Sequence, residues 1–472
     1  MGGRVPNRAA RLLTLGAAIP LGGCLAGPNY VRPETPQPPA WHTQLVNGMT
    51  DAQSDRDALA SWWSVLDDPL LSELVSHAIA NNLDVEAARE RVHEAHQRRL
   101  FAEAGLLPTV RARSTATPQQ GYHGRTPETG LEALWTFDVA GRIRRSVEAA
   151  QGDQQAREED LHDALVNVAA EVVQAYVDLR AVQAHLGIAD ANLDAQREAA
   201  QLAGWRAQVG LTSSLDVVRA NTDLQQTSAQ LPSLYGGIEE AENRLALLLS
   251  ETPGSLAERL EAAKPLPTVP SEVAVGVPAE ALERRPDVRR AERVLAAETA
   301  RIGVAKAQEY PTISLTGAVG ANAISPTTFA SFSAPPAAAG AVALAVTQVL
   351  FDHGAIRATI RGQQAVRTEA RDRFQQVVLG ALGDVENAMI EYGREQERLR
   401  GLVEASASAK DAAVLSRERY ASGLADFQVV LDSERSLYAL EEQRVSSQAR
   451  VVIDLAHLYR ALGGGWSAEA PA

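Results

Sequence analysis

The sequence predicts a mostly α-helical protein with a small β component, built from two copies of one unit. Three observations predict this class. Segments separated by 203 residues match one another, which indicates an internal duplication. Two long segments without proline show heptad spacing, which indicates coiled-coil helices. Short segments between the helices alternate apolar and polar residues, as strands do.

Composition narrows the function classes. The 472 residues carry a formal net charge of −14 and only 5% aromatic residues. This argues against nucleic-acid binding, because the Lys and Arg clusters that release counterions are missing. The single cysteine excludes an internal disulfide and a cysteine-based zinc site, so packing or assembly must supply the stability.

The N-terminus reads as an export signal over residues 1–23. Three arginines precede an apolar stretch at 12–21 that is too short to span a bilayer. The following Leu-Gly-Gly-Cys resembles a bacterial lipobox, which implies a covalent lipid on Cys24 and no other cofactor. The residue after it, Leu25, implies by the same resemblance sorting to the outer membrane. The alternative is a secreted protein with an incidental buried cysteine.

The duplication covers most of the remaining chain. Pro108 matches Pro311 at an offset of 203 residues without a gap, whereas Phe137 matches Phe351 at an offset of 214. The second copy therefore carries an 11-residue loop insertion between these landmarks. The predicted organisation is a signal peptide at 1–23, a lipid-anchored N-terminal segment at 24–68, a first repeat at 69–250, a linker at 251–278, a second repeat at 279–463 and a C-terminal tail at 464–472.

Each copy begins with a helix, at 84–104 and 287–307, which a proline then stops. Two strand-like runs follow in each copy. Their expected bounds are 109–118, 131–138, 312–320 and 341–351. Runs of roughly 9 to 11 residues suit tilted transmembrane strands, and a soluble hairpin pair is the alternative. No apolar run of about 18 residues follows the signal, so any membrane-spanning part must be made of strands.

Long helices come next, at 141–209 and 355–422, each of which would extend about 100 Å. Such rods need a partner along their length. Apolar residues advance by alternating threes and fours, which predicts a left-handed coiled coil. In the first copy they are Leu161, Leu165, Val168, Val172, Ala175, Leu179, Val182, Leu186, Ala189 and Leu193, and in the second Phe374, Val377, Ala381, Val385, Ala388 and Tyr392.

A turn follows each rod, at Gly210 and at Gly423, and a return helix then packs back along it, at 215–249 and 427–462. Each copy therefore contains a helical hairpin. Four strands cannot close a barrel, because the smallest membrane barrels need about eight. Geometry alone permits a dimer with eight strands, a trimer with 12, or a larger assembly.

Several motifs resemble those of the TolC-like outer-membrane factors, in particular the efflux lipoproteins often called NodT or OprM-like. They include "GPNYVRP" after the cysteine, "RRPDVRRAE", "LFDHGAIR" and the closing "YRALGGGW". The resemblance implies a homotrimer in which four strands per chain complete a 12-stranded outer-membrane β-barrel that continues into a periplasmic α-barrel of coiled-coil helices. It implies a passive exit duct of a tripartite efflux system. Its expected partners are a periplasmic adaptor and an inner-membrane pump, commonly of the resistance-nodulation-division (RND) type.

Two other functions stay open at this point. A related duct would serve type I protein secretion, although the lipobox and "RRPDVRRAE" favour the efflux branch. A lipid-anchored periplasmic coiled-coil scaffold would lack a pore altogether. Pore formation in planar bilayers separates a duct from a scaffold.

The resemblance also implies a periplasmic gate at the two hairpin turns. Asp432 matches an aspartate of the family's constriction ring, and Val429 stands where some relatives have a second one. Asp216 matches an acidic position of the first turn. Tyr420 matches a tyrosine that keeps the gate shut by hydrogen bonding toward that acidic residue. A lone aspartate near a helix start would otherwise read as a helix cap or a solvated residue.

The arginine that reinforces this lock in some relatives aligns with Ala425, so the lock is expected to be looser or to use Arg419. Catalytic motifs are missing: no nucleophile elbow, phosphate-binding loop or zinc-peptidase helix appears, and we expect no enzyme activity. His93 and His96 share a helix face near two glutamates, but a solvated surface explains them better than a metal site. No metal is therefore expected.

Overall fold

The computed structural model describes residues 25–34, 38–53, 55–118, 125–322 and 338–467. The expected signal peptide and the lipid attachment at Cys24 lie outside these residues. So does most of the inserted loop of the second copy, from 323 to 337.

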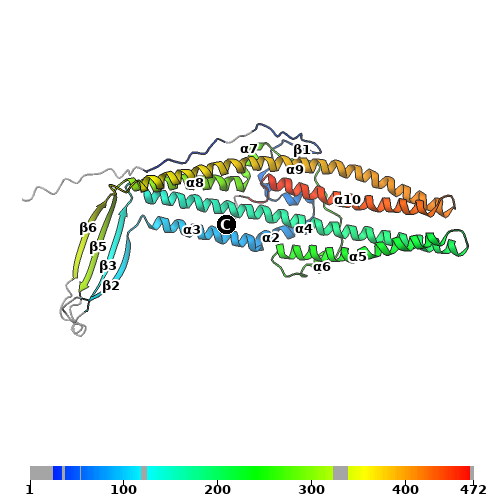
Figure 1. Ribbon diagram of the computed structural model, residues 1–472, viewed down its shortest axis with the longest axis horizontal. Coiled ribbons are helices and arrows are strands. Elements are labelled where there is room, and N and C mark those ends of the chain that lie inside the picture. The colour runs from blue at the N-terminus through cyan, green and yellow to red at the C-terminus, as the bar shows by residue number, and fades with distance from the viewer. Residues whose placement is uncertain (1–24, 35–37, 54, 119–124, 323–337, 468–472) are drawn as a thin grey trace, which may run out of the picture. The chain divides into compact units, whose positions relative to one another are not determined.

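The chain passes twice through the same order of elements (Figure 1). The first copy consists of α2 (Pro69–Asn81), α3 (Leu83–Ala104), β2 (Thr109–Pro118), β3 (Arg125–Phe137), α4 (Arg142–Gln208) and α5 (Ser214–Leu248). The second consists of α7 (Pro278–Arg284), α8 (Pro286–Lys306), η2 (Ala307–Glu309), β5 (Thr312–Asn322), β6 (Ala338–Thr347), α9 (Ala355–Ala421) and α10 (Phe427–Ala461). Outside the two copies lie β1 (Met49–Thr50), α1 (Arg56–Ala60), η1 (Trp62–Leu66), α6 (Ala257–Leu260) and β4 (Val273–Ala274). The predicted helices therefore agree with the observed ones to within one or two residues. Among the described residues, no helix is both long and apolar enough to cross a membrane.

The described residues form two units. Unit 1 is drawn from Met1–Arg32, Glu94–Gln154 and Arg293–Arg371, and unit 2 from Pro33–His93, Gln155–Glu292 and Asp372–Ala472. Helices α4 and α9 begin in unit 1 and continue into unit 2.

Unit 1 contains an antiparallel sheet of four strands in the order β2-β3-β5-β6. Several of the predicted strand bounds are wrong, those of β3 and β6 by the most, because pairing partners rather than local composition decide where a strand ends. Strand β3 starts at Arg125, well before the expected 131, because Arg125 pairs with Pro118 of β2. Strand β6 stops at Thr347 instead of 351, because its partner Thr312 is the first residue of β5.

The Phe-Asp landmark of each copy ends the sheet and starts the long helix. The Asp138 carboxylate accepts hydrogen bonds from the backbone N–H groups of Ile143 and Arg144, at 2.8 and 2.9 Å. The Asp352 carboxylate does the same for Gly354 and Ile356, at 2.9 and 2.7 Å. These contacts satisfy backbone donors that a helix start leaves free, so the same residue type recurs at both copies for one physical reason.

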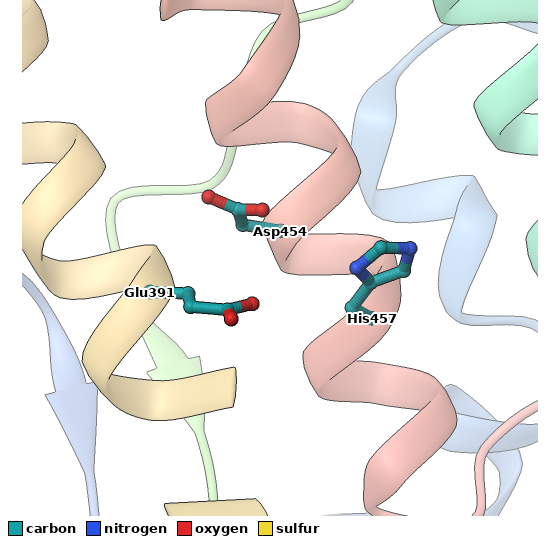
Figure 2. Close-up of side chains that lie close together, drawn as sticks. All are labelled: Glu391, Asp454 and His457. Carbon is teal, nitrogen blue, oxygen red and sulfur yellow. The ribbon is translucent and has the colours of Figure 1, made fainter. Parts of the chain in front are cut away.

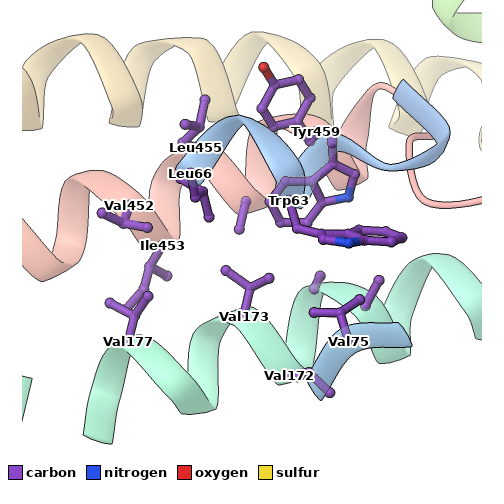
Figure 3. Close-up of a cluster of buried hydrophobic side chains, with 14 of the residues drawn as sticks. Trp63, Leu66, Val75, Val172, Val173, Val177, Val452, Ile453, Leu455 and Tyr459 are labelled. Atoms are coloured by element: carbon purple, nitrogen blue, oxygen red, sulfur yellow. The ribbon is translucent and has the colours of Figure 1, made fainter. Parts of the chain in front are cut away.

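The core of unit 2 joins helices of both copies to the N-terminal segment (Figure 3). Most of the heptad positions predicted on α4 are buried there, including Val172 and Leu179, which are fully enclosed. The N-terminal segment contributes Trp62, which is 1% exposed and stacks on Tyr459 of α10 with ring centroids 5.2 Å apart. Strand β1 also pairs in parallel with β4 of the linker. The N-terminal segment is thus part of the core.

Candidate functional site

The two hairpin turns of unit 2 have the same backbone geometry. Gly210 and Gly423 adopt positive φ angles of 76° and 74°, a conformation that favours glycine. After each glycine the next N–H reaches back to a carbonyl five residues earlier: Leu211 to Arg206 and Leu424 to Arg419, both at 2.8 Å. This is the Schellman motif, which satisfies the last carbonyls of a helix. The duplicated turn therefore follows from one local rule.

Asp216 lies at the start of the first return helix. Its carboxylate accepts hydrogen bonds from the Thr212 hydroxyl at 2.6 Å and from the Ser213 hydroxyl and backbone N–H at 3.1 and 3.3 Å. Ser213 and Asp216 form a reciprocal capping box on α5. These bonds, led by the one from Thr212, hold the pKa of Asp216 below its ordinary value of 3.8. Asp216 therefore stays ionised and caps its own helix.

Tyr420 lies at the end of α9, buried to 4% exposure. It belongs to a small apolar cluster with Ala203, Ala220, Phe427, Val430 and Leu431. Among the described residues the Tyr420 hydroxyl has no hydrogen-bond partner. The expected hydrogen bond between Tyr420 and Asp216 is therefore not formed within this chain.

An arginine on α4 holds Tyr420 in place. The Arg206 guanidinium lies 4.6 Å from the centre of the Tyr420 ring and donates to the Tyr420 carbonyl at 2.7 Å. It combines a cation–π contact with a bond to the C-terminal end of α9, where a positive charge is favourable. Arg419, the expected substitute arginine, is exposed, and in the described part of the chain its side chain makes no ion pair. Within this chain Tyr420 is instead contacted by Arg206, a residue that the sequence patterns did not single out.

Asp432 is exposed on α10. It accepts a hydrogen bond from the Gln428 amide at 2.9 Å, and Gln428 in turn accepts one from Arg219 of α5 at 3.1 Å. Val429 is also exposed. Asp432, Gln428 and Arg219 thus form a chain of polar contacts that links the two return helices beside the turns.

Two ion pairs support this region from inside. Arg435 of α10 contacts Asp223 of α5 at 2.6 Å, and Arg417 of α9 contacts Glu434 of α10 at 2.7 Å. Both carboxylates are buried whereas both arginines are partly exposed. Burial raises the pKa of Glu434 above its ordinary value of 4.5, and the nearby Arg417 lowers it only in part. The sequence motif "LDSERSLY" already contains two of these charged residues, because Glu434 and Arg435 follow shortly after Asp432.

The duplicated order of helix, β-hairpin and helical hairpin defines the TolC-like class of outer-membrane channels. The chain belongs to the outer membrane efflux protein family, whose model matches residues 74–251 and 277–464. It is a channel of the outer membrane that extends into the periplasm and serves as an exit for efflux, and it is not an enzyme.

Individual relatives cover nearly the whole chain. Nodulation protein T of Rhizobium leguminosarum bv. trifolii is 31% identical over 98% of this chain and 99% of that protein. The pyoverdine export outer membrane protein OpmQ of Pseudomonas aeruginosa is 29% identical over 97% of each. Among solved structures, the outer-membrane channel OprN is 34% identical with a TM-score of 0.84, covering 94% of this chain and 100% of that one. The open-state channel MtrE of Neisseria gonorrhoeae is 27% identical with a TM-score of 0.81, covering 94% and 99%.

Proposed function

We propose that the protein is the outer-membrane exit duct of a tripartite efflux system and works as a homotrimer. The observation that carries the assembly is the sheet of unit 1. Its outer strands β2 and β6 each pair on one side only within the described chain. Open edges are not tolerated in hydrocarbon, and four strands are too few to close. Pairing β6 of one subunit with β2 of the next removes both edges, and three subunits give the 12 strands expected from the family resemblance.

Cysteine cross-linking tests this assembly. Val110→Cys on β2 is combined with single cysteines scanned over 341–345 on β6, in full-length protein in membranes. For at least one of these cysteine pairs, we expect oxidation to give cross-linked dimers and trimers and no larger species. Ala133→Cys on β3 is the matched control, because β3 is paired on both sides inside the chain and should not cross-link to β6 of a neighbour. A ladder that ends at the dimer would contradict the trimer.

The proposed partners are a periplasmic adaptor and an inner-membrane pump of the RND type, and the proposed cargo is small organic molecules. Two relatives support the cargo class: one is named for pyoverdine export and another, from Pseudomonas putida, for solvent efflux. Cross-linking and co-purification of the native protein should recover both partners, and a deletion strain should become more sensitive to compounds that the pump carries. Recovery of a secreted protein instead would favour type I secretion.

The lipid anchor on Cys24 is a separate part of the proposal. A tether made of several acyl chains would hold each subunit durably at the membrane surface. Metabolic labelling with radioactive palmitate should mark the wild-type protein and leave Cys24→Ser unlabelled. Labelling that survives this substitution would place the lipid elsewhere or show a different modification.

We further propose that Asp216, Tyr420 and Asp432, with Arg206, belong to the periplasmic gate. Three copies of the exposed Asp432 around a narrow pore would attract cations and repel anions. In planar bilayers, Asp432→Ala should raise single-channel conductance or lower cation selectivity. Asp411→Ala, at an exposed aspartate of α9, is the control. Unchanged conductance and selectivity in the Asp432 variant would remove this residue from the gate.

A further inference from the structure

One group of metal-ligating side chains lies apart from the hairpin turns, in unit 2. Glu391 of α9 and Asp454 and His457 of α10 each offer one ligand atom, and these atoms lie within 4.8 Å of one another. Figure 2 shows the three side chains on the facing parts of the two helices, with Glu391 extending toward α10. Among the described residues, this is the group of three possible metal ligands whose atoms lie so close together.

The placement follows from helix geometry. Asp454 and His457 are three residues apart on α10, so they share one face of that helix. The α9 rod packs beside α10 as the other half of its hairpin and supplies the third side chain. A carboxylate followed by a histidine at i+3, met by a glutamate from a facing helix, is a ligand pattern that helical bundles use for metals.

The state of Asp454 is a second observation that favours a cation. The residue is only 2% exposed. Its Oδ1 atom lies 2.8 Å from the Arg450 Nε, which pairs the two charges, yet this oxygen receives no hydrogen bond of acceptable geometry within the described chain. Buried carboxylates are paired with a charge or coordinate a metal, and an ion at this place would add a second compensating charge to the one from Arg450. Arg450 itself is half exposed, so its charge is shared with solvent.

A cavity provides room for further ligands. It has a volume of about 310 Å³, and both Glu391 and His457 line it. Asp163, Asp287 and Asp384 add acidic groups to its wall, against the basic Arg285 and Arg460. Water in this space would complete the coordination of an ion that holds only three protein ligands, the arrangement of open zinc sites.

We propose that Glu391, Asp454 and His457 form a Zn²⁺ site that joins α9 to α10. One imidazole and two carboxylates are ligands that zinc accepts. Ligand atoms around a tetrahedral zinc lie about 3.4 Å apart. The three ligand atoms, which lie within 4.8 Å of one another, would therefore have to move closer together around a bound ion. The other histidine pair considered from the sequence differs, since His93 is exposed and neither His93 nor His96 is part of a described three-ligand group.

Metal titration of the full-length protein in detergent tests the proposal. The protein is first stripped with a chelator and then titrated with Zn²⁺ by calorimetry and with Co²⁺ by visible absorption, which reports the coordination of the ion. We expect one ion per chain in the wild type, together with a Co²⁺ band. His457→Gln and Glu391→Gln should each weaken Zn²⁺ binding about tenfold or more and abolish the band.

The design separates a built site from surface binding. His96→Gln, a half-buried histidine on α3, is the matched control and should bind as the wild type does. Glu391 is exposed, so its substitution should leave the fold intact even if His457→Gln destabilises the protein. Wild-type affinity in both ligand variants would overturn the proposal. An equal loss in the His96 variant would also overturn it, because the ion would then bind histidines nonspecifically.

Discussion

At the scale of single residues, the end of α9, where we propose a gate, is held by contacts to the backbone and to an aromatic face. Arg206 bonds to the carbonyls at the end of α9 and covers the Tyr420 ring, while the tyrosine hydroxyl is left without a partner in the described chain. Within this chain Tyr420 is therefore contacted through its ring and its carbonyl, and not through its hydroxyl.

This distinction gives a prediction. Arg206→Ala should raise the resting conductance of the channel in planar bilayers more than Tyr420→Phe does, because the phenylalanine keeps the ring that the guanidinium contacts. A cation–π contact of this kind contributes about 0.5 to 2 kcal/mol. The opposite order, with a large effect of Tyr420→Phe, would show that the hydroxyl forms the lock, as the family resemblance implies.

The buried Glu434 makes stability depend on pH. Its pKa in the folded protein is raised, mainly by burial, above the ordinary 4.5. The folded state therefore gains protons more readily than the unfolded state, and this contribution to stability is complete below about 4.5 and is lost as pH rises through the folded pKa.

Thermal melting of wild type and Glu434→Gln between pH 7 and pH 4.5 measures this effect. The wild type should gain stability relative to the neutral variant as pH falls. The exposed Glu418→Gln is the control and should run parallel to the wild type. A difference between wild type and Glu434→Gln that stays constant with pH would show that Glu434 titrates normally.

At the scale of elements, the two helical hairpins depend on glycine at their turns. A Cβ at Gly423 would meet only the Arg206 Nη2 at 3.8 Å, and one at Gly210 would meet nothing within 4 Å. Substitution therefore causes no clash, and its penalty is the positive φ angle alone.

Gly423→Ala and Gly210→Ala should each lower the free energy of unfolding by about 1 to 2 kcal/mol. Gly401→Ala inside α9 should have the opposite sign and raise it by about 0.5 to 1 kcal/mol, because that glycine is helical and a Cβ there is unobstructed. Denaturant titration of the three variants checks this. Equal effects at positions 423 and 401 would contradict a role for the left-handed conformation.

At the scale of the whole molecule, the N-terminal segment is a structural part of the periplasmic region. Trp62 packs in the core of unit 2 with residues from α4 and α10, and so ties both copies of the duplication to a segment that belongs to neither. Gly464 and Gly465 let the start of the C-terminal tail approach this tryptophan closely.

Removing this side chain should be costly. Trp62→Ala should lower the free energy of unfolding by about 3 to 5 kcal/mol, the range for a large buried aromatic. Trp205→Ala is the matched control, because that tryptophan is 63% exposed and should change stability little. Denaturant titration followed by circular dichroism measures both. A small effect of Trp62→Ala would mean that the N-terminal segment detaches without disturbing the helices.

The sequence by itself determined the duplication, the helices, the two turns and the four strands of this protein. These features depend on local periodicity, proline, glycine and caps, which act over a few residues. Only the tertiary structure decided the bounds of β3 and β6, the contact of Arg206 with Tyr420 and the meeting of Glu391 with Asp454 and His457. Each of these features depends on contacts between residues that lie far apart along the chain, so no local sequence pattern predicts them. The proposed contacts between subunits follow the same principle, since the strand order of one chain does not contain the register of pairing with another.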